Sequence, residues 1–132
     1  MNQYHSFHIQ LLEQTYNQLI CRYPFNVEDL PLQEQEFLDS YLSLIEHCKN
    51  FSEGYIENGQ VLCISWIRAY SELTPLLPRD LLWFFSGDCL HYMPDEEIEQ
   101  FQRLDELRYE AESAAEEFNY ATERAKIFNL VH

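Results

Sequence analysis

Apolar residues recur at three- and four-residue steps along most of this chain, which is the spacing of one face of an α-helix. The first such stretch, 4–23, ends where Pro24 disfavours helical backbone in the residue before it. The second begins near Pro31, because a first turn tolerates the missing N–H, and it continues to Phe51. The pattern therefore predicts two amphipathic helices. The apolar stripe of the second is wide enough to contact neighbours on more than one side.

Two shorter helices are expected in the middle of the chain. Gly54 and the pair Asn58-Gly59 interrupt the apolar pattern, so we interpret 51–60 as a turn-rich loop. Helices then follow over 61–73 and 79–86, and the second of these is apolar on every side, which indicates a place in the centre of the core. No segment offers a partner for a lone β-strand, whose backbone groups would stay unpaired. The fold class predicted is therefore all-α.

The last helix is expected to be long and acidic, completing a small bundle of about five helices. It begins at Pro94, and because no Gly or Pro follows, we expect it to run to about Phe128, a length of about 50 Å. Its apolar positions step alternately by three and four, as in a coiled-coil seam. These positions are Leu104, Leu107, Ala111, Ala114, Phe118, Ala121, Ala125 and Phe128. We expect the seam to pack against the N-terminal helices or against its copy in a homodimer.

Length and charge narrow the classes of function. The chain has 132 residues, a length typical of a single domain. It carries 23 acidic and 8 basic residues, which give a net charge of −15. Direct binding to nucleic acid or to an anionic membrane needs a basic surface and is not expected. A basic protein partner suits this charge, although acidity also keeps a protein soluble without any partner. The candidate partner-binding residues are acids of the last helix: Glu106, Glu110, Glu112, Glu116 and Glu117.

The sequence predicts a cytoplasmic protein with no membrane span. The first twelve residues carry no Lys or Arg and several polar residues, unlike a secretory signal. Cysteines stay reduced in the cytoplasm, and the spacing of the four cysteines matches no zinc site. We therefore expect all four to be small buried apolar residues: Cys21, Cys48, Cys63 and Cys89.

Few side chains form a pattern that indicates catalysis. Glycine-rich nucleotide motifs and the G-x-S-x-G motif are absent. The densest mixture of reactive groups is Asp88, Cys89 and His91, where an imidazolium would activate a thiolate; the alternative is that these residues only cap and pack. Carboxylates at the start of the last helix are candidate Mg²⁺ ligands: Asp95, Glu96 and Glu99. No cofactor is predicted.

The favoured hypothesis is a non-enzymatic protein of regulatory or adaptor type that acts through protein–protein contacts. It rests on the net acidity, the long helix and the lack of catalytic motifs. One alternative is an enzyme, either a Mg²⁺-dependent nucleotide hydrolase or a catalyst built on Cys89 and His91. A second alternative is a nucleic-acid mimic that presents carboxylates to a basic protein and inhibits it.

Overall fold

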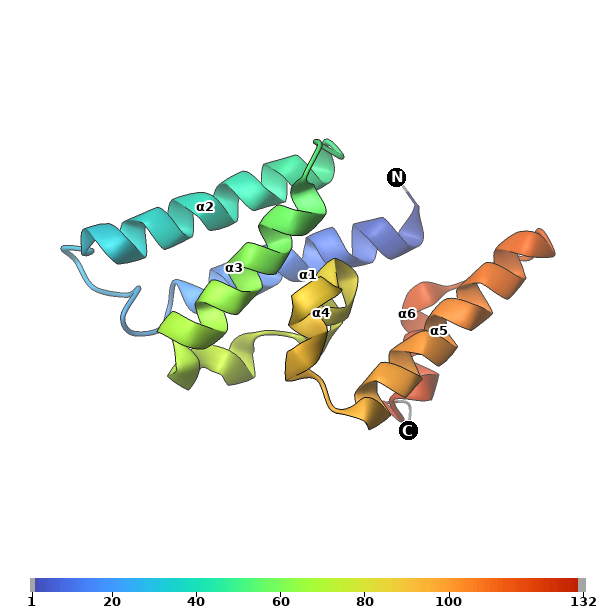
Figure 1. Ribbon diagram of the computed structural model, residues 1–132. Helices are drawn as coiled ribbons and strands as arrows, with labels where there is room; N and C mark the ends of the chain where they lie inside the picture. The colour runs from blue at the N-terminus through green and yellow to red at the C-terminus, as the bar shows by residue number, and fades with distance from the viewer. Residues whose placement is uncertain (1, 131–132) are drawn as a thin grey trace.

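The computed structural model describes residues 2–130, which form α-helices and 3-10 helices and no β-strand (Figure 1). The all-α prediction is thus confirmed. The count of five helices is wrong, because the described part of the chain contains six α-helices and two 3-10 helices. In chain order these are α1 (Gln3–Leu19), α2 (Leu32–Lys49), α3 (Tyr55–Ala69), η1 (Ser71–Leu76), α4 (Arg79–Phe85), η2 (Gly87–Tyr92), α5 (Asp95–Ser113) and α6 (Tyr120–Ile127).

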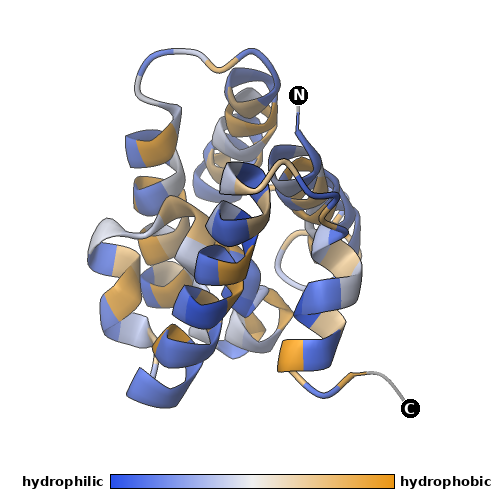
Figure 2. Cartoon of the chain, turned by 90° about the vertical axis from the view of Figure 1, so that its right-hand side faces the viewer, coloured by the Kyte–Doolittle hydropathy of each residue, from blue (hydrophilic) through white to orange (hydrophobic). Residues whose placement is uncertain are grey.

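The core lies where α1, α2, α3 and α4 meet, and large aromatic side chains fill it. Tyr41 and Trp66 are fully buried, and each finds a backbone acceptor there. The Tyr41 hydroxyl donates to the carbonyl of Leu12 at 2.8 Å, and the Trp66 indole donates to that of Leu73 at 3.2 Å. Hydrophobic and hydrophilic residues alternate along most helices, as expected of amphipathic helices around one core (Figure 2). As predicted, α4 lies in the core, and five of its seven residues are buried.

The loop predicted over 51–60 is wrong in its second half, because α3 already begins at Tyr55. Gly59 lies inside this helix and not in a turn. A Cβ atom at this position would come within 2.1 Å of the ring of Phe85, which is fully buried. Gly59 is therefore explained by the close approach of α4 to α3, a role that a glycine can have without breaking a helix.

The single long C-terminal helix is also wrong. The first part, α5, ends at Ser113, and α6 turns back beside α5 at the right-hand end of the molecule (Figure 1). Ala115 adopts a left-handed backbone with φ of +54°, and the N–H of Glu116 donates to the carbonyl of Ala111 at 2.9 Å. This is the hydrogen bond of a Schellman C-cap, which usually has glycine where Ala115 stands. The side chain of Asn119 then caps α6 by accepting from the N–H of Thr122.

The break between α5 and α6 removes the predicted coiled-coil seam. Ala114 and Ala121 are exposed, whereas Tyr120 is buried against the first helix. The helix α6 is held in place by the Arg124 guanidinium, whose Nη2 lies 2.8 Å from Oδ1 of the buried Asp80 on α4. The acidic C-terminal segment is therefore a helical hairpin packed on the bundle, and it offers no continuous rod for a homodimer.

Two smaller predictions also need correction. The first helix ends at Leu19, four residues before the predicted end at Tyr23. Cys21 is exposed, in contrast to the expectation, whereas the other three cysteines are buried. No helix within residues 2–130 combines the length and the apolar character needed to cross a bilayer.

Candidate functional site

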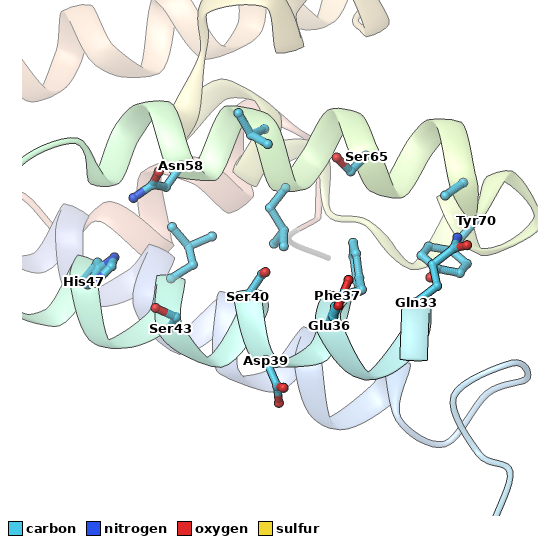
Figure 3. A pocket seen from close by; sticks show the side chains of 14 residues that line it. Gln33, Glu36, Phe37, Asp39, Ser40, Ser43, His47, Asn58, Ser65 and Tyr70 are labelled. Atoms are coloured by element: carbon cyan, nitrogen blue, oxygen red, sulfur yellow. The ribbon is translucent and has the colours of Figure 1, made fainter. Parts of the chain in front are cut away.

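A long groove lies between α2 and α3 and has a volume of about 710 Å³ (Figure 3). Side chains from both helices line it, and Figure 3 shows Ser40 and Phe37 on α2 facing Ser65 on α3. On α2 the lining residues are Gln33, Glu36, Phe37, Asp39, Ser40, Ser43, Leu44 and His47. The remaining lining residues are Asn58, Val61, Leu62, Ser65, Ala69 and Tyr70.

The floor of the groove is apolar and its upper walls carry short side chains. Leu44 and Leu62 are buried at the base, and Val61 leaves 64% of its surface exposed, although it lies in the middle of a helix. Ser40 and Ser65 are too short to fill the space between the two helices, so the groove remains open. A helix pair with a well-packed interface would place larger apolar residues at such facing positions.

The charges along the groove are all of one sign. Glu36 and Asp39 lie one turn apart on α2 and are both exposed, and the side chain of Asp39 points away from α3 (Figure 3). Of the fourteen lining residues, all of them in the described part of the chain, none is Lys or Arg. His47 is half-buried near the other end. The groove therefore combines an apolar floor with an acidic edge.

The structure does not assemble the predicted cysteine–histidine site. Cys89 is fully buried, and its thiol points to the backbone carbonyl of Gln60 at 3.8 Å. Asp88 and His91 are exposed and lie 3.8 Å apart, so they form a surface pair away from the thiol. A hydrogen bond from Cys63 lowers the pKa of Cys89, yet the burial of the sulfur leaves a substrate no access.

The three candidate Mg²⁺ ligands do not form a metal-binding group in the described part of the chain. Asp95, Glu96 and Glu99 are exposed at the start of α5, and no group of three or more His, Cys, Asp or Glu residues within 2–130 could hold a metal ion. Glu96 and Glu99 line a shallow depression together with Arg103. The guanidinium of Arg103 already supplies a positive charge beside these carboxylates, which opposes binding of a second cation.

The five acids predicted as partner contacts are exposed on α5 and on the turn that follows it: Glu106, Glu110, Glu112, Glu116 and Glu117. Arg103 lies 3.3 Å from Glu106 and 4.0 Å from Glu110, so two of the five carboxylates are partly neutralised. Figure 1 shows α5 at the opposite side of the molecule from α2. A molecule seated in the α2–α3 groove would thus not contact these acids.

Sequence reasoning overlooked a buried polar cluster between α1, α4 and α6. His8 is fully buried and stacks on Phe84, with ring centroids 4.6 Å apart, and its Nδ1 lies 2.7 Å from the carbonyl of Tyr4. Burial lowers the pKa of His8 to about 4, so the imidazole is neutral at pH 7. Asp80 and Arg124 complete the cluster. His8 and Asp80 are buried and Arg124 is partly exposed, so the cluster offers no open cavity and has a structural role.

Comparison with known proteins adds a family but no precedent for function. Searches of curated proteins and of solved structures each found no match. One family model covers the chain almost from end to end, over residues 1–131. Because this match spans nearly the whole sequence, the chain belongs to the PA2817-like family.

Proposed function

We propose that this protein is not an enzyme and acts by binding a basic protein partner in the α2–α3 groove. The observation that carries the proposal is the groove itself, which is lined by the solvent-exposed Val61 on α3 and by the acidic residues Glu36 and Asp39 on α2, with no Lys or Arg among its lining residues. Exposed apolar surface bordered by polar residues is typical of protein-binding sites. Charges of one sign at the edge favour a partner of the opposite sign.

The position of the reactive groups supports binding over catalysis. Cys89 is buried with its sulfur directed at a backbone carbonyl, whereas His91 and Asp88 are on the surface. The alternative enzyme built on Cys89 and His91 therefore does not have its candidate side chains gathered around one cavity that a substrate could enter.

The charge also argues for a different protein as partner and not for a second copy of this chain. Two copies that met through the groove would bring together two surfaces that carry Glu36 and Asp39 and no lining Lys or Arg, and each copy carries a net charge of −15. Like charges that meet at an interface oppose association. We therefore expect the purified protein to be a monomer at neutral pH. In the cytoplasm we expect it to bind a different protein that has a positively charged surface.

Affinity capture from a cytoplasmic extract tests this function with two matched variants. Val61→Lys puts a positive charge into the groove, and Leu42→Lys makes the same change at another exposed apolar position of the surface, 45% exposed on α2 but outside the groove. We expect the wild-type protein and Leu42→Lys to retain the same basic partner, and Val61→Lys to lose it. Raising the salt concentration should also release it, because salt screens charge–charge attraction.

Two results would contradict the proposal. In the first, Val61→Lys and Leu42→Lys bind the captured partner equally well, which would mean that the groove is not the contact surface. The other is a partner lost only when acids of α5 such as Glu112 and Glu116 are replaced by Gln. That outcome would favour the nucleic-acid mimic, in which the carboxylates alone are recognised.

A further inference from the structure

We infer that the groove receives an amphipathic α-helix of about four turns from the partner, with Lys or Arg residues beside its apolar stripe. This inference rests on the proposed function and adds the form and length of the bound element. It draws on three features of the groove: its walls, its length and the position of its charges.

The walls exclude an extended strand as the natural occupant. Both walls are α-helices, and their backbone N–H and C=O groups are already paired within α2 and α3. A bound strand would find no free edge to complete its own backbone hydrogen bonds, as strand addition requires. An α-helix satisfies its backbone internally and presents only side chains. The groove therefore favours a helix.

The length of the groove sets the length of that helix. On α2 the lining residues extend from Gln33 to His47, and on α3 from Asn58 to Ala69. At 1.5 Å per residue these spans are about 21 Å and about 16 Å. A ligand helix of about 14 residues, four turns, matches the longer wall. Its apolar residues at i, i+3, i+4 and i+7 would lie along the floor.

The bound helix would contact the floor chiefly through Val61, because Leu62 and Leu44, which also line the groove, are only 6% and 2% exposed. The short side chains of Ser40 and Ser65 on either side leave room for the larger apolar side chains of the ligand to reach this floor. Val61 is the most exposed of the three apolar residues, so covering its side chain would remove more apolar surface from water than covering either of the others.

The charges specify where the ligand must be basic. Glu36 and Asp39 are three residues apart on α2 and both line the groove from this helix, with the Asp39 side chain pointing away from α3 (Figure 3). A ligand helix with two Lys or Arg residues spaced by three or four would bring both positive charges to the α2 side of the groove. Acidic residues at the same ligand positions would be repelled.

Three synthetic 18-residue peptides test the inference, with binding measured by fluorescence anisotropy and mapped by NMR. The first peptide has Leu at helical spacing and Lys elsewhere. The second has the same composition in an order that spreads Leu around the helix, and the third has Glu in place of Lys. We expect the first peptide to shift the resonances of α2 and α3 around Val61, and to bind at least tenfold more tightly than the second. The third should not bind.

Protein variants identify the surface that the first peptide uses. We expect Val61→Lys to weaken its binding at least tenfold and Leu42→Lys to change it less than twofold. The double variant Glu36→Gln, Asp39→Asn should weaken binding about fivefold or more. Its matched control, Glu106→Gln with Glu110→Gln, removes the same charge from α5 and should have a smaller effect, because those residues lie on the other side of the molecule.

The outcomes separate this inference from the proposed function. Equal binding of the first and second peptides would overturn the inference that the ligand is an amphipathic helix, because charge alone would then suffice for binding. The proposal of a basic partner would be unaffected by this result. Equal effects of Val61→Lys and Leu42→Lys overturn the groove itself, and with it the proposed function. Failure of all three peptides to bind overturns the inference as well, whereas loss of the captured partner in Val61→Lys would still support the proposed function.

Discussion

The ion pair between Arg124 and Asp80 gives the sharpest test of how the C-terminal hairpin is attached. The side chain of Asp80 is 5% exposed and that of Arg124 is 24% exposed, and the guanidinium Nη2 lies 2.8 Å from Oδ1. In the variant Arg124→Met the aliphatic stem is preserved while the positive charge is lost. The carboxylate of Asp80 is then buried without its partner, the costly way to break such a pair.

The expected loss follows from this burial. Removal of one member of a buried pair costs about 3–5 kcal/mol, and the partial exposure of Arg124 places this case near the lower end, at about 3 kcal/mol. For a chain of 132 residues, this corresponds to a melting temperature about 11 °C lower. Urea unfolding followed by circular dichroism measures the loss directly.

Two companion variants make this reasoning refutable. Asp80→Asn added to Arg124→Met removes the unpaired charge, so the double variant should be at least about 1 kcal/mol more stable than the single variant. Lys126→Met, on the same helix, breaks the ion pair between Lys126 and Glu123, in which the Lys126 side chain is mostly exposed. This change should lower the free energy of unfolding by less than about 0.5 kcal/mol. A loss below about 1 kcal/mol for Arg124→Met, or a double variant no more stable than the single one, would refute the role assigned to this pair.

Three further predictions concern a buried histidine, a close helix contact and a helix end. Burial lowers the pKa of His8 to about 4, so between pH 6.5 and 4 the unfolded chain binds the extra proton. The stability of the wild type relative to His8→Phe should therefore fall by up to about 3 kcal/mol as the pH drops through that range in urea titrations. Gly59→Ala should destabilise by about 1–3 kcal/mol, despite the better helix propensity of alanine, because its Cβ would overlap Phe85. Ala115→Gly should stabilise by about 1 kcal/mol, because Ala115 has a positive φ.

Each of these predictions has a result that would contradict it. A wild-type pH profile parallel to that of His8→Phe would mean that His8 titrates normally in the folded protein. If Gly59→Ala were as stable as the wild type, the contact with Phe85 would not be tight. Destabilisation by Ala115→Gly would indicate a helix that continues through this residue, since glycine inside a helix costs about 1 kcal/mol.

The sequence predicts where amphipathic helices lie better than where they begin and end. The periodic stripes of α1, α2 and α5 depend on which residues face the core, and the chain itself displays that pattern. Gly59 and Ala115 mislead for opposite reasons. Gly59 resembles a turn residue but allows α4 to approach α3, whereas Ala115 resembles a helix residue but takes the left-handed backbone of a C-cap. Gly59 depends on a tertiary contact with Phe85 and Ala115 on the local hydrogen bonds of the C-cap, and single-residue propensities contain neither.

The candidate site was only partly foreseeable from the chain. The wide stripe on α2 predicts more than one contact surface, and two acids on that helix, Glu36 and Asp39, border the groove. What the sequence does not display is the absence of a covering element over Val61, because an apolar residue at helical spacing is usually buried. Conversely, Cys89 and His91 are only two positions apart in sequence but face different surroundings, because η2 turns the thiol inward and leaves the imidazole in solvent.

Photo-crosslinking from the groove tests most directly the claim that this protein works by binding a basic helix. A benzophenone-bearing residue replaces Val61 in one version of the protein and Leu42 in a control version, and both are irradiated inside the cell. We predict that position 61 links to one partner through a segment of about four helical turns that carries Lys or Arg beside its apolar residues, and that position 42 does not. Identical crosslinks from both positions, or a linked segment that is acidic or lacks helical periodicity, would contradict the account.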